Sequence, residues 1–429
     1  MPNPESSPVP SRPGRLADFL GLRRSIAGLL SMVILVGMGE HMAEQFLPLY
    51  LLALGGGFVS VGFLNGMDNL LGALYSFPGG YLSDRLGTKR ALLLFNLVSM
   101  AGFLVVVLVP RWPVVLAAAA LFLSWTAISL PATMSLVARV LPKNKRTMGV
   151  SVHSLVRRLP MALGPVVGGA FIGVWGVEKG VRMAFAGALI MAAAAAALQQ
   201  MLIEADPPGK GSPATAPERN PLRLWKLMNG DLRNLLVSDI LIRFCEQIPY
   251  AFVVIWAVGT RDNPGPVTAA QFGLLRSIEM ATAILIYVPV AWLADRGRKK
   301  PFVAMTFVFF TLFPILLHFS RSFWTLAAAF VLRGLKEFGE PTRKALIMDL
   351  APEDRKAGVF GLYYLIRDVI VSAAAFGGAF LWQHSPGLNL LTAFAFGAIG
   401  TVWFVMRGRD LGSQPLRPST PIDAKGAGL

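Results

Sequence analysis

Long apolar runs recur along the whole chain, and short polar stretches or stretches rich in glycine and proline separate them. About 20 apolar residues give an α-helix the length to cross the hydrocarbon layer of a bilayer. The pattern therefore predicts twelve transmembrane helices in an all-α chain. The predicted spans are residues 26–54, 59–82, 91–110, 113–138, 149–175, 181–203, 234–258, 268–292, 301–319, 323–349, 357–382 and 388–406.

The longest interruption falls between the sixth and the seventh run and is rich in Pro, Gly and Ser, which is typical of a flexible linker. An amphipathic stretch near its end is predicted to lie on the membrane surface. The chain is thus expected to divide six helices plus six. The predicted parts are an N-terminal tail (1–25), a six-helix bundle (26–203), a cytoplasmic linker (204–233), a second six-helix bundle (234–406) and a C-terminal tail (407–429).

The composition agrees with a membrane protein, because 54% of the residues are hydrophobic and only 15% are charged. The formal net charge of +16 does not indicate nucleic-acid binding, since the basic residues form short clusters between apolar runs. The single cysteine, Cys245, excludes an internal disulfide and a cysteine-based zinc site. We expect no metal, no cofactor and no enzyme chemistry.

The basic residues also predict the orientation in the membrane. On these bounds the two tails and the loops after even-numbered helices hold 26 Lys and Arg residues, whereas the opposite loops hold 4. Loops rich in Lys and Arg face the cytoplasm. Both termini are therefore predicted to be cytoplasmic, in a plasma membrane of bacterial inner-membrane type.

The two halves carry matching residues at shifts of 209 to 211 positions, which indicates an internal duplication. The matched pairs are Asp68 with Glu279, Asp84 with Asp295, Arg85 with Arg296, Arg158 with Arg367, Gly168 with Gly377 and Gly169 with Gly378. Two six-helix bundles related by an axis along the membrane normal are typical of a transporter that holds its substrate between them, near the midplane.

The loop between the second and third helices contains a motif of glycines and charges. It reads Gly80-x-x-x-Asp84-Arg85-x-Gly87-x-Lys89-Arg90, and Asp295 and Arg296 start a partial copy between the eighth and ninth helices. This motif resembles the signature of the major facilitator superfamily. The resemblance implies two pseudo-symmetric six-helix bundles and secondary transport. It also implies that these residues form a conformational latch, in which the acid caps a helix or pairs with an arginine.

A second motif lies in the fifth helix, where Gly164-Pro165 is followed by Gly168-Gly169, and Gly377-Gly378 repeats its end in the eleventh helix. Small residues allow helices to approach closely, and proline bends a helix. The element is similar to one found in the family's 12-helix drug/proton antiporters. That resemblance implies proton-coupled export.

Twenty Asp, Glu, Lys and Arg residues fall within the predicted spans, where ionisable groups are costly and usually functional. Several lie roughly 13 to 18 Å from a membrane face, which is the midplane. We predict that they line a polar cavity. The candidate substrate-binding residues are Arg158, Arg367, Glu246, Glu279, Arg276, Arg333 and Glu337.

Arg158 and Arg367 occupy equivalent positions in the two halves, so their guanidinium groups could clamp a carboxylate or phosphate of the substrate. The alternative is that the buried charges are structural ion pairs. Four pairs have the required helical spacing, namely Arg243 with Glu246, Arg276 with Glu279, Arg333 with Glu337 and Lys336 with Glu340.

No nucleotide-binding loop is present, so an ion gradient or the substrate gradient must drive transport. A carboxyl group that loses water as the cavity closes can take up a proton. Asp68, Glu44 and Glu40 are the candidates for proton coupling. The Glu40-to-Phe46 segment also resembles the first-helix signature of proton-coupled peptide transporters, an alternative that implies import.

These observations predict a secondary transporter that moves a small amphipathic or anionic molecule by alternating access, most simply by proton-coupled efflux. Two alternatives stay open. One is a proton-coupled importer or facilitator of a polar metabolite such as a peptide or an organic anion. The other is a receptor or scaffold without transport. The expected partners are the substrate, protons and the lipid bilayer, and the protein is expected to be a monomer.

Overall fold

The structure is a computed structural model, and it describes most of the chain. The described residues are 24–123, 125, 129, 133, 136, 146–204, 225–226, 228–261, 263–294, 299–351 and 356–409. Side chains are not described at residues 24, 76–80, 83–84, 146–155, 287–288, 291–294 and 356–358. Within this part the backbone is helical apart from turns and one isolated bridge between Gly259 and Pro264.

The first half contains one pair of short helices and several long ones. Its elements are α2 (Arg24–Glu44), α3 (Leu47–Ala53), α4 (Phe58–Leu86), α5 (Thr88–Leu108), α6 (Trp112–Phe122) and α8 (Arg146–Leu202). The last of these is two helices that meet at Gly176, whose φ of 74° lies in the region that glycine favours. It therefore accounts for both the fifth and the sixth predicted span.

The second half repeats this pattern with more interruptions. Its elements are α10 (Gly230–Gln247), η2 (Tyr250–Phe252), α11 (Val253–Val258), α12 (Ala269–Ala294), α13 (Lys299–Phe319), α14 (Phe323–Leu335), η3 (Lys336–Gly339), α15 (Glu340–Leu350), α16 (Lys356–His384) and α17 (Pro386–Arg407). Eight helices among the described residues are long and apolar enough to cross a membrane. The prediction of an all-α, twelve-helix membrane protein is confirmed.

Three of the predicted spans are interrupted in the structure, and each break lies next to a proline. The first span breaks between α2 and α3 before Pro48, the seventh breaks at Pro249, and the tenth passes through the 3₁₀ turn η3 before Pro341. Proline lacks a backbone N–H and clashes with the preceding turn of a helix, so it favours such breaks. Polar residues, among them Glu44, Gln45 and Tyr250, lie at or beside these breaks.

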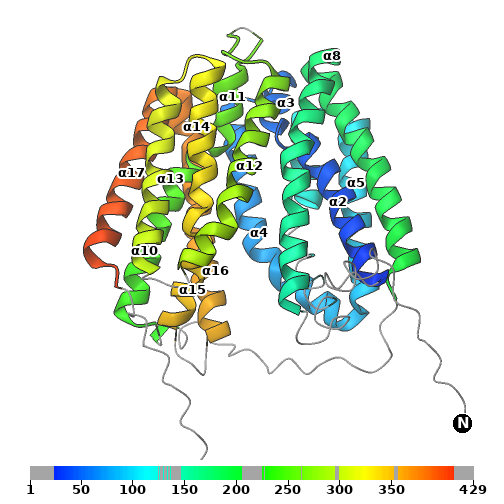
Figure 1. Ribbon diagram of the computed structural model, residues 1–429. Helices are drawn as coiled ribbons and strands as arrows, with labels where there is room; N and C mark the ends of the chain where they lie inside the picture. Colours follow the sequence, from blue (N-terminus) through cyan, green and yellow to red (C-terminus); the bar gives the residue numbers. More distant parts are fainter. Residues whose placement is uncertain are drawn as a thin grey trace, which may run out of the picture.

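The helices form two bundles, with α2, α5 and α8 in one and α10, α13, α14 and α17 in the other (Figure 1). The bundles meet along two pairs of helices. Gly62 of α4 lies against Ala379 of α16, and Gly169 of α8 lies against Ala269 of α12. Since these pairs are equivalent in the two halves, the interface has the expected pseudo-symmetry.

The bundles are joined at one end of the molecule and separate at the other. We call the end at which α2 begins and α17 finishes the tail end (Figure 1). Away from the tail end, one hydrophobic core includes Phe46 of the first half and Phe272 of the second, whose ring centroids are 5.9 Å apart. Toward the tail end each half has its own core, around Leu29 in the first and Phe307 in the second.

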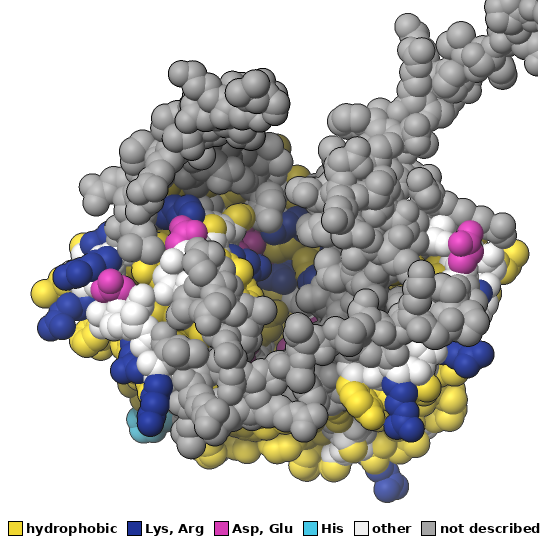
Figure 2. All heavy atoms as spheres, turned by 90° about the horizontal axis from the view of Figure 1, so that it is seen from below, with side chains coloured by type: hydrophobic (Ala, Val, Ile, Leu, Met, Phe, Trp, Pro, Cys, Tyr) yellow, Lys and Arg dark blue, Asp and Glu magenta, His cyan; other side chains and the backbone are white. Residues whose placement is uncertain are grey.

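Seen from the tail end, the described side chains surround a hollow in which basic and acidic groups are visible (Figure 2). The outer faces of the helices instead expose large apolar side chains. Ile190, Leu285, Trp324 and Met406 are each more than 70% exposed. Such a surface suits contact with lipid rather than water.

Candidate substrate-binding cavity

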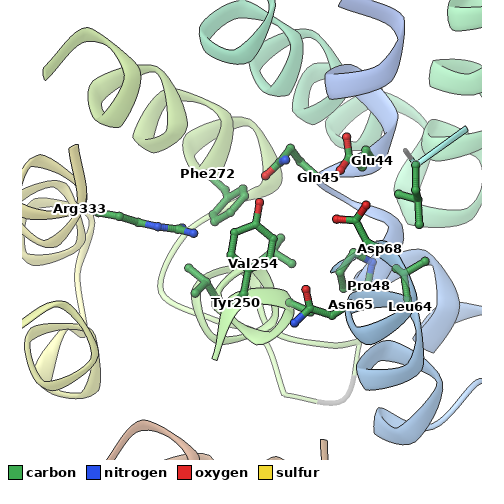
Figure 3. A pocket seen from close by; sticks show the side chains of 13 residues that line it. Glu44, Gln45, Pro48, Leu64, Asn65, Asp68, Tyr250, Val254, Phe272 and Arg333 are labelled. Atoms are coloured by element: carbon green, nitrogen blue, oxygen red, sulfur yellow. The ribbon is translucent and has the colours of Figure 1, made fainter. Parts of the chain in front are cut away.

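A cavity of about 510 Å³, part of it open to solvent, lies between the two halves. Both halves contribute to its wall (Figure 3). The lining residues are Glu44, Gln45, Pro48, Leu64, Asn65, Asp68 and Leu123 from the first half, and Tyr250, Ala251, Val253, Val254, Phe272 and Arg333 from the second.

The helix breaks explain why polar groups line this cavity. Glu44 and Gln45 stand at the break between α2 and α3, and Tyr250 stands at the break between α10 and α11. Asn65 and Asp68 lie on one face of α4, because residues three apart are neighbours on a helix. Transporters commonly form substrate sites from such discontinuous helices.

Amide side chains tie the halves together beside the cavity. Asn65 Nδ2 donates to the backbone oxygen of Gln247 at 3.0 Å, and Asn69 Nδ2 donates to Gln247 Oε1 at 3.2 Å. Sequence reasoning missed these two asparagines and Tyr250, because it considered only ionisable groups at the midplane.

The wall from the first half is acidic. Glu44 Oε2 lies 3.6 Å from Nδ1 of His41, and Asp68 has no hydrogen-bond or ion-pair partner among the described residues. Glu40 is 5% exposed and lies one turn before Glu44, within reach of the charges of Glu44, Asp68 and Arg157. All three residues predicted to couple protons therefore lie together, and two of them line the cavity.

The wall from the second half is basic, because its charged lining residue is Arg333. Behind it Arg243, Arg276 and Lys336 contact Glu246 and Glu279, and Arg243 also contacts Glu340 at 3.5 Å. Glu279 binds Arg276, lies 3.4 Å from Arg333 Nε and 3.8 Å from Lys336 Nζ. Glu246 accepts hydrogen bonds from Arg243 at 2.6 Å and from Lys336 at 2.7 Å.

Arg333 is the member of this group that reaches the cavity. Its guanidinium group stacks on Tyr250 and Phe313, with centroid distances of 5.4 and 5.0 Å. It also lines a smaller cavity of about 270 Å³ together with Glu246, Lys336 and three phenylalanines of α13.

Two of the four predicted intrahelical pairs form, namely Arg243 with Glu246 and Arg276 with Glu279. The other two are replaced by different pairs, three between helices and one, Glu340 with Arg343, within α15. The 3₁₀ turn η3 changes the spacing around Glu337, so that the carboxylates of Glu337 and Glu340 turn toward Arg158 and Arg343. Arg333 and Lys336 then bind acids on neighbouring helices.

A second buried network lies nearer the tail end in the second half. Asp239, 1% exposed, binds Arg343, which is also 1% exposed, and accepts hydrogen bonds from Tyr363 Oη at 3.1 Å and Arg367 Nη1 at 3.4 Å. Arg343 also binds Glu340 at 2.7 Å. Neither Arg343 nor Asp239 was named as a candidate in the sequence analysis. The position of both within apolar runs was the available signal.

The predicted arginine clamp is not assembled around the cavity in this state. Arg158 Nη2 lies 3.2 Å from Glu337 Oε2 across the halves, whereas Arg367 binds Asp239 and, at 2.7 Å, Asp368. Of the seven predicted substrate-binding residues, Arg333 lines the main cavity. The clamp by Arg158 and Arg367 stays a prediction for another state of the cycle.

The predicted latch is described in part. Gly80 lies in α4, and Gly87, with a φ of 81°, makes the sharp turn into α5. Lys89 Nζ donates to the backbone oxygen of Gln200 at 2.7 Å, so the turn packs on its own half. Arg85 Nη1 lies 3.5 Å from Tyr81 Oη, and Arg90 is exposed. The side chain of Asp84, and Asp295 and Arg296, lie outside the described residues, and the latch stays a prediction.

Glycines of the second motif lie where backbones approach closely. A Cβ atom at Gly164 or Gly168 would press on α2, and one at Gly169 would press on α12. Pro165 lies beside Gly273 of α12, and Gly378 lies against the backbone oxygen of Ile248, whereas Gly377 faces open space. The motif thus packs α8 against both halves.

The sequence matches the profile of the Major Facilitator Superfamily over residues 29–259 and 265–426. The chain belongs to the major facilitator superfamily. No curated protein matches it. Membership of this family makes the chain an integral membrane protein that transports small molecules.

Solved structures of other transporters share this major facilitator fold. A variant of the nucleoside transporter NupG matches with a TM-score of 0.78 and 11% identity, covering 90% of this chain and 100% of that one. A peptide transporter POT in complex with sulfate matches with a TM-score of 0.69 and 16% identity, covering 89% of this chain and 93% of that one. The human organic anion transporter MFSD10 matches with a TM-score of 0.58 and 16% identity, covering 89% of this chain and 99% of that one. At these identities the likeness extends to the fold alone.

Proposed function

We propose that this chain is a proton-coupled secondary transporter that exports a small, charged, amphipathic molecule by alternating access, with no covalent step. The observation that carries the proposal is the cavity between the halves, which has an acidic wall on one side and a basic wall on the other. It lies where a substrate would be exposed to each side of the membrane in turn.

The packing of the two halves supports alternating access. They share one core away from the tail end and have separate cores near it, so a rocking motion would break one set of contacts and form another. Glycine-lined contacts between α4 and α16 and between α8 and α12 belong to the set that would break as the closed end opens. We assign the tail end to the cytoplasm, because loops rich in Lys and Arg lie there.

Under this assignment both termini are cytoplasmic, the protein works as a monomer in a plasma membrane of bacterial inner-membrane type, and the described state opens inward. Protease accessibility of a tag at each terminus, in intact cells and in inverted vesicles, tests the assignment. Cleavage at the outer surface of intact cells would contradict it.

The acidic wall supports proton coupling. Asp68 has no partner among the described residues, and Glu40 and Glu44 lie close to it. Crowding of like charges and loss of water both favour protonation of a carboxyl group. A proton bound in one state of the carrier and released in the other would link transport to the proton gradient. Export rather than import rests on the antiporter-like element from Gly164 to Gly169.

The test uses purified protein in proteoliposomes with an imposed pH gradient and a panel of amines, organic acids and zwitterions. We expect at least one compound to evoke proton movement opposite to its own. Asp68→Asn should abolish uphill transport and leave counterflow exchange, because the substrate still crosses when the proton site is neutral.

The matched control is Asp349→Asn, which removes a carboxylate that pairs with Lys299 away from the cavity. It should leave uphill transport intact. Uphill transport that survives in Asp68→Asn would remove this residue from the coupling role. Proton movement in the same direction as the substrate would turn the proposal into import, and silence across the whole panel would contradict transport.

A further inference from the structure

We propose, on the basis of the function above, that the substrate is a zwitterion with its two charges at opposite ends. Its cationic group, an ammonium or a guanidinium, would lie against Glu44 and Asp68. Its anionic group, a carboxylate or another oxyanion, would lie against Arg333. A short apolar body would separate them.

The first half offers the cationic end an excess of negative charge. Glu40, Glu44 and Asp68 stand against one guanidinium, that of Arg157, and the imidazole of His41. Arg158, the other cation in this region, is already bound to Glu337. In Figure 3 the carboxylates of Glu44 and Asp68 both face the space between the halves. A bound cation would therefore meet two acceptors that the protein itself leaves free of strong ion pairs.

The second half offers the anionic end an excess of positive charge. Glu279 is 1% exposed and has to neutralise Arg276 and Arg333 together, with Lys336 only 3.8 Å away. Arg276 is 8% exposed, and its Nε has no hydrogen-bond partner. Lys336 is bound more closely by Glu246, at 2.7 Å, so Glu279 is left to pair with two guanidinium groups. A substrate oxyanion beside Arg333 would supply the missing negative charge.

The two charged walls are held apart by apolar and neutral polar groups. Phe272, Tyr250 and Val254 lie between Arg333 and the acidic side chains, and Pro48 and Leu64 lie beside Asp68 (Figure 3). This arrangement suits a substrate with a hydrocarbon or aromatic body. It does not suit a molecule with both charges on one carbon, because that molecule could not reach both walls.

The energetics favour a ligand with both charges over a ligand with one. Charges in a site of low dielectric interact strongly, and an unpaired buried charge is costly. A simple cation would neutralise the acidic wall and leave Arg333 with its shared partner. A simple anion would do the reverse and leave Glu44 and Asp68 facing each other. A zwitterion of the right length neutralises the excess charge of both walls at once.

The position of the charges sets the shape of the first probe. Glu44 and Asp68 belong to the first half and Arg333 to the second, so a substrate needs several atoms between its charges to reach both walls. We therefore choose a linear body of several methylene groups.

Three matched probes test the proposal, namely 6-aminohexanoate, hexanoate and hexylammonium. Binding is measured by the shift in thermal unfolding of the purified full-length protein and by isothermal titration calorimetry. We expect 6-aminohexanoate to bind at least ten-fold more tightly than either singly charged probe, since each charged hydrogen bond contributes about one such factor. Glycine, with both charges on one carbon, should not match it.

Two variants test which charged end of the substrate binds which wall of the cavity. Asp68→Asn should weaken 6-aminohexanoate by about ten-fold and leave hexanoate unchanged, whereas Arg333→Gln should weaken 6-aminohexanoate and leave hexylammonium unchanged. The matched controls are Asp349→Asn and Arg409→Gln, which alter exposed charges away from the cavity. If Arg333→Gln does not fold, the Asp68→Asn result decides the polarity on its own.

The proposal is overturned if hexanoate or hexylammonium binds as tightly as 6-aminohexanoate, or if none of the three binds. Transport of another class of compound in proteoliposomes would then leave the proposed function standing without this substrate class. Conversely, tight binding of 6-aminohexanoate without movement of any compound across the membrane would support the site and contradict the transporter.

Discussion

Each buried carboxylate in the second half serves more than one cation, and this sharing determines what single residues contribute. Asp239 is bound by Arg343, Arg367 and the hydroxyl of Tyr363, and all four groups are almost fully buried. Ions lose their hydration on burial and recover it only through such contacts. Removing one partner therefore lowers the free energy of unfolding far more than removing an exposed ion pair does.

Arg343→Met should destabilise the protein by about 3 to 5 kcal/mol, because it leaves Asp239 and Glu340 short of a cation in a dry environment. Lys344→Met is the matched control. The side chain of Lys344 is 53% exposed, and its Nζ lies 3.6 Å from the same Glu340. Its replacement should therefore lower the free energy of unfolding by less than about 1 kcal/mol. Unfolding of both variants in mixed micelles measures the difference, and equal losses would show that the Asp239 network has no special weight.

Residue-scale prediction from the sequence succeeded where spacing alone decides a contact. Arg243 with Glu246 and Arg276 with Glu279 lie three residues apart within unbroken helix, and both pairs form. The sequence could not place Arg343, because its partner Asp239 is 104 residues away. Nor could it show that Tyr250 and Asn65 face the cavity, since that depends on how two helices are broken and packed.

At the scale of elements, the helix breaks and the glycine contacts define the cavity and its closed end. Proline positions were visible in the sequence, but whether a proline bends, ends or interrupts a helix depends on its neighbours. The twelve spans were correctly predicted because a run of apolar residues is a strong signal. Their interruption by η3 and at Pro249 was not predicted, although these breaks shape the binding site.

Gly169→Ala should shift the protein away from the described state. A Cβ atom there would overlap the backbone oxygen of Ala269 across the interface, and a backbone cannot move aside as a flexible side chain can. Gly62→Ala, whose Cβ would meet that of Ala379, should act in the same direction on the other side. The control is Gly173→Ala, where no atom lies within 4 Å of the added Cβ.

The measurement is the distance between spin labels at positions 179 and 383, which are exposed helical positions of α8 and α16 at the closed end, in a background without Cys245. Both interface variants should populate a longer distance, because the closed end must open to relieve the overlap. The Gly173 variant should match the parent. An unchanged distribution in both interface variants would mean that these contacts do not hold the state closed.

At the scale of the whole molecule, the duplication and the family resemblance were enough to predict two six-helix bundles with a site between them. They were not enough to predict which end is closed. A carrier has to be stable in both states, so its sequence contains the contacts for each and favours neither strongly. The separation of the predicted arginine clamp belongs to the same problem, since Arg158 and Arg367 bind different acids in the state described here.

Of the ion pairs in the described part of the chain, one joins the two halves. It is formed by Arg158 of α8 and Glu337 of η3, at 3.2 Å, with side chains 18% and 24% exposed. A partly exposed pair contributes about 1 kcal/mol or less to stability. That is small against the free energy of folding, but large against an equilibrium between two carrier states of similar energy.

Arg158→Glu or Glu337→Arg alone should therefore shift this equilibrium by about 1 kcal/mol, since each places like charges opposite one another. The double reversal should restore the pair and return the distance between labels 179 and 383 to that of the parent. Reversal of the Lys299 and Asp349 pair, which lies within the second half, should leave the distance unchanged. If the double variant shows the sum of the two single shifts, the charges do not interact, and the halves are held together by their apolar and amide contacts alone.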